Sequence, residues 1–288
     1  MDWFFYIIIA TVLYGVYNFI YKLATSKGIS SSQIVNKAAI SVSILSFLTI
    51  LILGSEFVDI ELILFFALLN SSAFALGAVC KVKALSYIPT SYVFPIGKMN
   101  AFLVIILSIV FLGDRPTINQ YIGFLFILLM MLILFWDVFD NRKNSNYKNV
   151  KLGIMLASVS AIATAGSMFV GKFASTSVTI LNYIFVSYSM VAIYTYLIPK
   201  FINRNTLLEK TSKSVYFYGF AAGLLNFIGY YLVLKAFACG PLSLIQGISA
   251  TALAIPIFLS IVFLKESFNL KKGLIVLFAL IAIILIKI

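Results

Sequence analysis

One segment of this chain occurs twice, and the repeat restricts the folds that the sequence can adopt. Residues 83–114 align without a gap with residues 235–266, and the aligned positions share a Lys-Ala pair, a proline and isoleucines. Within them, residues 107–112 and 259–264 both have the sequence Leu-Ser-Ile-Val-Phe-Leu. Apolar segments resemble one another easily, but a matched lysine, proline and uninterrupted apolar block in one register are hard to obtain by chance. We therefore infer an internal duplication.

The composition places most of the chain in lipid. Of 288 residues, 62% are hydrophobic and only 10% are charged, whereas about 25% of the residues of a soluble domain are charged. The net charge of +12 would suggest nucleic acid in a soluble protein. Here the Lys and Arg residues flank apolar runs, which favours contact with lipid headgroups and no nucleic-acid partner. Two cysteines and no histidine predict neither a disulfide nor a metal or other cofactor.

Apolar runs of membrane-spanning length follow one another along the chain. A bilayer core of about 30 Å needs roughly 20 residues of helix, and no alternating pattern of a barrel is present. We predict an all-α membrane protein with ten transmembrane helices. The predicted spans are Trp3–Leu23, Gln33–Leu53, Glu61–Leu85, Thr90–Leu112, Thr117–Asp137, Val150–Lys172, Val178–Pro199, Ser214–Phe237, Pro241–Leu264 and Phe268–Ile288.

The most polar connector divides these spans into two equal sets. It predicts a first five-helix repeat at residues 1–140, a connector at 141–149 and a second five-helix repeat at 150–288. Because five is an odd number, the second repeat must enter the membrane upside down relative to the first. Two inverted-topology repeats are typical of secondary transporters, whose sites lie near the midplane between the repeats.

The basic residues are distributed unevenly between the two sides of the predicted bundle. One set of connectors contains most of them, including Lys27, Arg142, Lys143, Lys210 and Lys271, whereas the other set and the termini contain few. The positive-inside rule puts the basic set in the cytoplasm, and therefore both termini outside.

The layout resembles that of a known family. Each half closes on an acidic turn, Phe-Leu-Gly-Asp-Arg-Pro at 111–116 and Phe-Leu-Lys-Glu-Ser at 263–267, and the first span begins Leu-Tyr-Gly-Val-Tyr-Asn-Phe-Ile-Tyr-Lys at 13–22. These features are similar to the drug/metabolite transporter superfamily, in particular its EamA-type members, with Tyr14 where the family has Trp. The resemblance implies a cell-membrane permease, not an enzyme, that moves a small metabolite by alternating access. It also implies that both termini lie in the cytoplasm. The charge distribution predicts the opposite orientation, and we favour the prediction from charge.

Lys98 is the most unusual residue of the predicted spans. It lies inside the fourth span, in a segment that ends at Asn100, where a charge costs about 3 kcal/mol or more. Its repeat equivalent is Ala250, so the duplication does not require a lysine. We predict that Lys98 and Asn100 face a substrate cavity. The alternative is a lysine that reaches the interface or pairs with backbone carbonyls near Pro95.

Four spans carry polar and aromatic side chains at helical spacing, which places them on single faces. The candidates are Tyr14, Tyr17, Asn18 and Tyr21; Asn70, Phe74, Gly77 and Lys81; Asn226 and Tyr230; and Gln246 and Ser249. As walls of a cavity they would be substrate-binding. The alternative is that their hydrogen bonds hold helices together. A small-residue stripe, residues 219–223, predicts close helix packing in the eighth span.

The acidic residues lie at span ends or in connectors, so no predicted span carries a deep carboxylate. Proton-coupled export of cationic drugs usually needs one, while a cavity lysine suits a carboxylate or phosphate. We predict a monomeric secondary transporter for a small polar metabolite, with amino acids and organic anions favoured. Cation or drug efflux through an aromatic-lined site is the alternative, and a membrane enzyme is a remote one.

Overall fold

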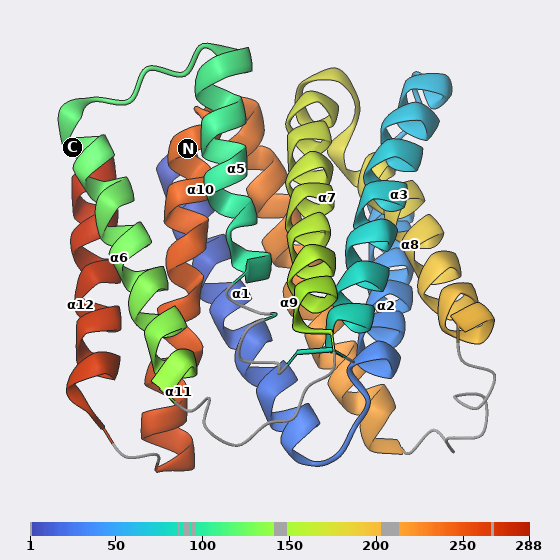
Figure 1. The fold of residues 1–288 in the computed structure, drawn as a ribbon. Helices are drawn as coiled ribbons and strands as arrows, with labels where there is room; N and C mark the ends of the chain where they lie inside the picture. Colours follow the sequence, from blue (N-terminus) through green and yellow to red (C-terminus); the bar gives the residue numbers. More distant parts are fainter. Residues whose placement is uncertain are drawn as a thin grey trace. The chain divides into compact units, whose positions relative to one another are not determined.

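The computed structural model describes residues 2–85, 87–88, 93, 96–140, 149–202, 213–265 and 268–288. All regular secondary structure in these residues is helical (Figure 1). The elements are α1 (Trp3–Ser26), α2 (Ser31–Leu53), α3 (Ile60–Leu85), α5 (Asn100–Leu107), the π-helix η1 (Ser108–Leu112), α6 (Ile118–Asp140), α7 (Val150–Ser177), α8 (Ile180–Ile202), α9 (Lys213–Cys239), α10 (Leu242–Ala250), the 3₁₀-helix η4 (Thr251–Leu253), α11 (Ala254–Leu264) and α12 (Leu270–Lys287).

The helices have the length and surface of membrane spans. Within the described residues, 7 helices are long and apolar enough to cross a membrane, and shorter apolar helices cover Ile96–Leu112 and Ile118–Leu134. Large apolar side chains such as Ile52, Phe111 and Phe217 remain exposed on them, which is a liability in water and normal in lipid. The all-helical multi-pass architecture is therefore confirmed, while the count of ten spans stays a prediction.

The helices form two compact units, and each unit takes residues from both predicted repeats. Unit 1 contains residues 1–75 and 170–239, and unit 2 contains residues 76–169 and 240–288. Of the connector predicted at 141–149, the structure describes Asn149 alone. The sequence repeats and the compact units are therefore different divisions of the chain.

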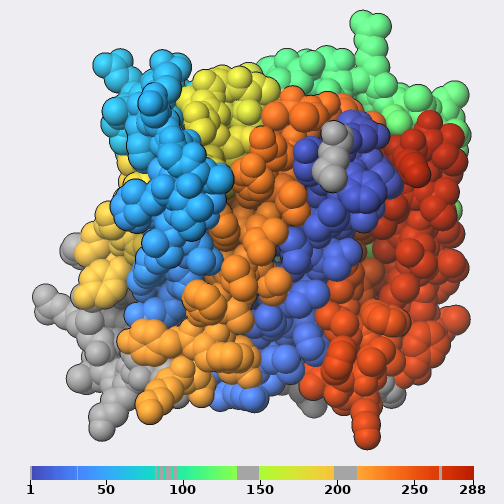
Figure 2. All heavy atoms as spheres, turned by 180° about the vertical axis from the view of Figure 1, so that it is seen from behind, coloured from blue at the N-terminus to red at the C-terminus, as the bar shows by residue number. Residues whose placement is uncertain are grey.

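In unit 1, α9 lies between α1 and α2, and α8 also packs on α2. Figure 2 shows this order on one face, with the orange α9 flanked by two blue helices. Two glycines of the predicted small-residue stripe permit the contact with α2. A Cβ atom at Gly219 would lie 2.3 Å from Cβ of Lys37, and one at Gly223 would lie 2.5 Å from Cβ of Ser41. Close packing at this stripe is confirmed.

In unit 2, α6 and α12 lie side by side (Figure 1). The side-chain amide of Gln120 on α6 donates a hydrogen bond of 3.3 Å to the carbonyl oxygen of Ile286 on α12. The duplication is visible in the backbone at two equivalent helix ends. Gly113 follows η1 and Lys265 follows α11, and both adopt the left-handed conformation, with φ of 72° and 52°.

Asp114, the acid of the first closing turn, supports a helix far away in the sequence. Its Oδ2 atom accepts hydrogen bonds from the backbone N–H of Ser243, at 2.9 Å, and from the Ser243 hydroxyl, at 2.7 Å. The Ser108 hydroxyl donates to the same oxygen. The N-cap of α10 is Pro241, whose side chain makes no capping hydrogen bond. The carboxylate therefore satisfies an N–H group that the helix end leaves free and places a negative charge at its positive end.

We expect Gly223→Ala to lower the stability of the protein. Alanine gains about 1 kcal/mol over glycine in a helix interior, but forcing a methyl group into a packed contact costs about 1–3 kcal/mol. The added atom would also lie 2.9 Å from the Ala38 carbonyl oxygen, which belongs to the backbone and yields little. Thermal unfolding in detergent measures the effect. Gly229→Ala is the control, because its nearest contact would be an ordinary 3.6 Å; equal midpoints for the two variants would contradict the prediction.

We expect Asp114→Ala to cost about 1–2 kcal/mol of stability, as the loss of a helix cap does. Asp114→Asn should retain most of this stability, because an amide oxygen can accept the same two hydrogen bonds. The same unfolding measurement checks both variants. Asp2→Ala is the control, since Asp2 occupies the N-cap of α1 without a capping hydrogen bond. If Asp114→Ala and Asp2→Ala had the same unfolding midpoint, the hydrogen bonds between Asp114 and α10 would contribute nothing to stability.

Candidate functional site

Polar and aromatic side chains from four helices gather inside unit 1, and we call them the tyrosine–asparagine cluster. Its members are Tyr14, Tyr17, Tyr21, Asn70, Tyr183, Tyr188, Asn226 and Tyr230. Most of them were candidates from helical spacing alone. The structure shows that the candidate faces of α1, α3 and α9 meet in one place.

Two buried amides join α3, α8 and α9. The Asn70 side chain donates a hydrogen bond of 3.0 Å to the Tyr230 hydroxyl and another to the Tyr183 hydroxyl. The Asn226 side chain donates one of 3.0 Å to the Tyr188 hydroxyl. The rings of Tyr188 and Tyr230 meet edge to face, with centroids 5.6 Å apart. An amide in an apolar interior is costly unless it is hydrogen-bonded, so these bonds fix the relative positions of the three helices.

Helix α1 adds a row of tyrosines to the cluster. The ring centroids of Tyr14 and Tyr17 are 6.1 Å apart, and those of Tyr17 and Tyr21 are 4.9 Å apart. Tyr14 packs on the backbone of α9, because a Cβ atom at Gly229 would lie 3.6 Å from the Tyr14 ring. The row lies on one face of α1 because its members are three and four residues apart. These contacts do not involve Asn18, which is half-buried on the same helix.

One hydroxyl of this row is incompletely paired. The Tyr21 hydroxyl is buried, and no described residue forms a hydrogen bond to it with good geometry. The neighbouring side chain is that of Tyr17, whose ring packs on the ring of Tyr21 in a tilted arrangement. A buried polar group of this kind costs free energy until a partner is supplied, so it is a place where a polar ligand atom gains an interaction.

Sequence reasoning missed the two tyrosines of α8, Tyr183 and Tyr188. No residue of the seventh predicted span was among the candidates from the sequence. The two residues are five positions apart and show no helical spacing of their own. The sequence offered one indication of them, because tyrosine hydroxyls in the middle of an apolar span need polar partners.

Four further candidates, Lys98, Asn100, Gln246 and Ser249, belong to unit 2. Lys98 is half-buried in the helical turn that precedes α5, and Asn100, also half-buried, begins α5. Gln246 is buried on α10, and its amide donates to the Met168 sulfur at 3.0 Å. Ser249, on the same helix, is half-buried. The predicted site residues therefore divide into a group in unit 1 and a group in unit 2.

A second lysine interacts with Lys98. Lys81 is half-buried on α3, and it has an electrostatic interaction with Lys98. The sequence placed Lys81 on the same face as Asn70 without connecting it to Lys98. That connection depends on how the chain turns between α3 and α5.

Nothing in the described part of the chain resembles a metal centre. No group of three or more His, Cys, Asp or Glu residues comes together there. Cys80 is a buried free thiol, and Cys239 is an exposed one. The candidate residues that the structure describes carry hydroxyls, amides, aromatic rings and ammonium groups.

The comparisons with known proteins agree with this architecture. The sequence profile described as the EamA-like transporter family matches residues 1–136 and again residues 151–288. One solved crystal structure, 13% identical, superposes with a TM-score of 0.78 over 98% of this chain and 96% of its own; at that identity it shows the fold alone. A search of curated protein sequences finds no match. The two family matches together cover nearly all of the sequence, so the chain belongs to the EamA-like transporter family, which is part of the drug/metabolite transporter superfamily.

Proposed function

We propose that this protein is a secondary transporter that moves a small polar metabolite across the plasma membrane by alternating access. The observation that carries the proposal is the tyrosine–asparagine cluster, because polar side chains deep in apolar helices are expensive and usually mark a pathway. Ten spans in two inverted repeats, acting as a monomer, complete the proposed architecture. Membership of a transporter family supports it.

Amino acids and organic anions are the favoured substrates. The buried polar side chains that the structure describes are Ser, Thr, Asn and Gln, with no Asp or Glu among them. Hydroxyl and amide groups of the cluster can donate hydrogen bonds to a substrate carboxylate. Separately, Lys98 is a half-buried positive charge within unit 2, and such a charge attracts an anion. A site without buried acids lacks the group that would neutralise a purely cationic substrate.

The tyrosine rings favour one alternative, the efflux of cations or drugs. The rings of Tyr188 and Tyr230 pack edge to face inside unit 1, and Tyr14 packs in the same way on Tyr17. Faces of aromatic rings attract organic cations through their π-systems, without any carboxylate. This alternative needs the rings, whereas the favoured proposal needs the hydroxyl and amide groups.

The substitution Tyr230→Phe separates the two alternatives, because it removes the hydroxyl and keeps the ring. We expect binding of the favoured amino acid or organic anion to weaken about tenfold, the effect of one hydrogen bond of about 1.5 kcal/mol. Binding is measured as thermal stabilisation of the purified protein in detergent, since a ligand of the native state raises its stability. The panel holds amino acids, organic anions, sugar phosphates and quaternary ammonium compounds.

The matched control for this measurement is Tyr231→Phe. Tyr231 is the neighbouring residue on α9, and its ring contacts the Lys235 ammonium, 5.6 Å from the ring centroid. The substitution Tyr231→Phe should leave ligand binding unchanged. If only quaternary ammonium compounds stabilise the protein, and Tyr230→Phe binds them as well as the wild type does, cation efflux replaces the favoured proposal. Uptake of the strongest ligand into proteoliposomes then tests transport itself.

The proposed orientation, with both termini outside, can be tested on the exposed thiol of Cys239. This residue ends α9, on the side where the charge distribution puts the extracellular connectors. We expect a membrane-impermeant maleimide to label it in intact cells. Cys239→Ser is the control for specificity, because the other thiol, Cys80, is buried. Labelling that requires permeabilised cells would reverse the orientation and agree with the family pattern.

A further inference from the structure

We propose that Asn226 is a positioning residue that makes the site of unit 1 select a carboxylate, because its amide holds the Tyr188 hydroxyl as a hydrogen-bond donor. The inference rests on the proposed function and deepens it. It names the group of the substrate that the tyrosine–asparagine cluster recognises and the side chain that enforces the choice. In this proposal Tyr188 contacts the ligand, and Asn226 acts through Tyr188.

The direction of one hydrogen bond carries the inference. The Asn226 amide donates to the oxygen of the Tyr188 hydroxyl at 3.0 Å. An amide N–H group can only donate, so the hydroxyl accepts in this bond and its own hydrogen stays available for another partner. No other residue in the described part of the chain forms a hydrogen bond with this hydroxyl. Tyr188 therefore has a donor to offer to a ligand.

The second amide of the cluster points in the same chemical direction. The Asn70 nitrogen donates to the Tyr183 hydroxyl and, at 3.0 Å, to the Tyr230 hydroxyl. Three tyrosine oxygens of the cluster thus accept hydrogen bonds from amides. A cation would compete with these amide hydrogens for the same lone pairs, whereas a carboxylate accepts a hydroxyl hydrogen in a strong, charge-assisted bond.

The Tyr188 ring is fixed in place and remains accessible. It packs edge to face on the Tyr230 ring, with 65° between the ring planes. Tyr188 is half-buried, whereas Tyr183, the other tyrosine of the cluster on α8, has no exposed surface. Because the ring and its hydroxyl are both held by neighbours, a ligand that binds there immobilises little additional side-chain freedom.

A purely structural contact between α8 and α9 explains the pair less well. Asn36 shows what such a contact looks like, because its amide donates to the Ala192 carbonyl oxygen at 3.0 Å and to the Thr195 hydroxyl at 3.1 Å on α8. The Thr195 hydroxyl in turn donates to the Val191 carbonyl oxygen at 2.8 Å, so its hydrogen is used within the protein. The Tyr188 hydroxyl lacks a matching acceptor among the described residues.

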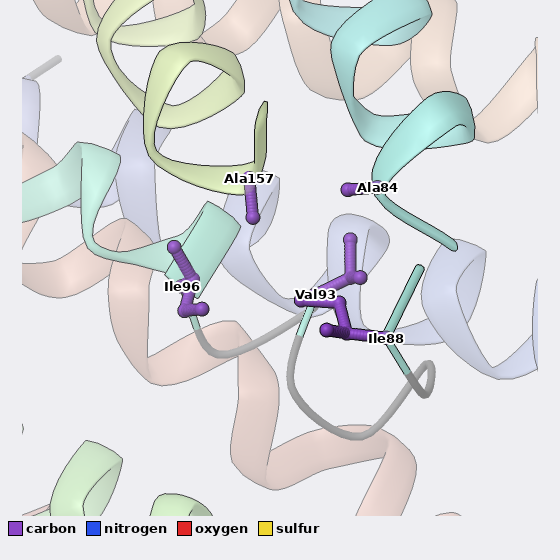
Figure 3. Packing of buried hydrophobic residues seen from close by; sticks show 5 residues of the cluster. All are labelled: Ala84, Ile88, Val93, Ile96 and Ala157. Carbon is purple, nitrogen blue, oxygen red and sulfur yellow. The ribbon is translucent and has the colours of Figure 1, made fainter. Parts of the chain in front are cut away.

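The buried core at the unit 2 end of α3 differs in chemistry from the cluster. Figure 3 shows this group, which consists of Ala84, Ile88, Val93, Ile96 and Ala157. These side chains are hydrocarbon, so none of them can donate a hydrogen bond to a carboxylate. Of these two buried groups, only the one in unit 1 can recognise an anionic oxygen.

The test compares carboxylate ligands with their carboxamides on the purified protein in detergent. Each amino acid or organic acid of the panel is measured beside its primary amide, such as alanine beside alaninamide and lactate beside lactamide, with affinity taken from thermal stabilisation. Wild type should prefer the carboxylate. Tyr188→Phe should reduce this preference about tenfold, the effect of one charged hydrogen bond. Asn226→Leu should reduce it about threefold or more, because the hydroxyl oxygen becomes free to accept from the carboxamide.

Three further variants separate positioning from a general loss of structure. The double variant should lose no more preference than Tyr188→Phe alone, because Asn226 acts through that hydroxyl. Asn226→Gln keeps an amide donor and should regain part of the preference. Asn36→Leu is the matched control, because both asparagines are 9% exposed and both join α8 to another helix. It should lower the unfolding midpoint and leave the preference unchanged.

An Asn226→Leu variant with the preference of wild type would overturn the inference, and so would additive losses in the double variant. If Asn226→Leu does not fold, Tyr188→Phe decides, because it removes a single oxygen atom; an unchanged preference there has the same meaning. If Tyr230→Phe weakens carboxylate binding while both substitutions at the pair leave the preference intact, this inference falls and the proposed function stands. If no carboxylate stabilises wild type, the favoured substrate class falls as well.

Discussion

A polar group inside a membrane-spanning helix costs free energy unless it finds a hydrogen-bond partner within the protein, and the rest of this structure depends on that cost. Serine and threonine hydroxyls find this partner within their own helix. Thr11, Ser46 and Ser260 donate to carbonyl oxygens four residues earlier, at 2.7, 2.8 and 2.6 Å. Amides cannot do so as easily and reach other helices. Asn36 on α2 donates to the Ala192 carbonyl oxygen on α8, at 3.0 Å. Polar residues therefore determine which helices of unit 1 must touch.

Helix α9 shows how close packing and the polar cluster depend on each other. Gly219, Gly223, Asn226 and Tyr230 follow one another at intervals of four, three and four residues, so they form one stripe. The glycines let the first half of the stripe approach α2 closely. The approach positions the second half, where the amide and hydroxyl meet the tyrosines of α8 and the asparagine of α3. A stripe of glycines alone would allow the contact with α2 but form no polar cluster. A stripe of large polar residues alone would form the cluster but prevent the close contact.

The two repeats share a backbone conformation at one pair of equivalent helix ends and differ in their chemistry elsewhere. The left-handed turns at Gly113 and Lys265 still correspond, although glycine adopts this conformation far more easily than lysine. By contrast, Lys98 corresponds to a buried alanine.

The sequence by itself determined the helical class, the approximate spans, the duplication and the glycine contact, because these follow from residue type and spacing along one helix. It also identified Tyr14, Asn70 and Tyr230 as unusual, since polar groups in apolar runs are visible without a structure. Only the tertiary structure showed that these residues share one cluster, that Tyr183 and Tyr188 complete it, and that Lys81 interacts with Lys98. Such contacts join helices that are far apart in the sequence. Helical periodicity gives the face on which a residue lies, but the partner of that face depends on how the helices pack.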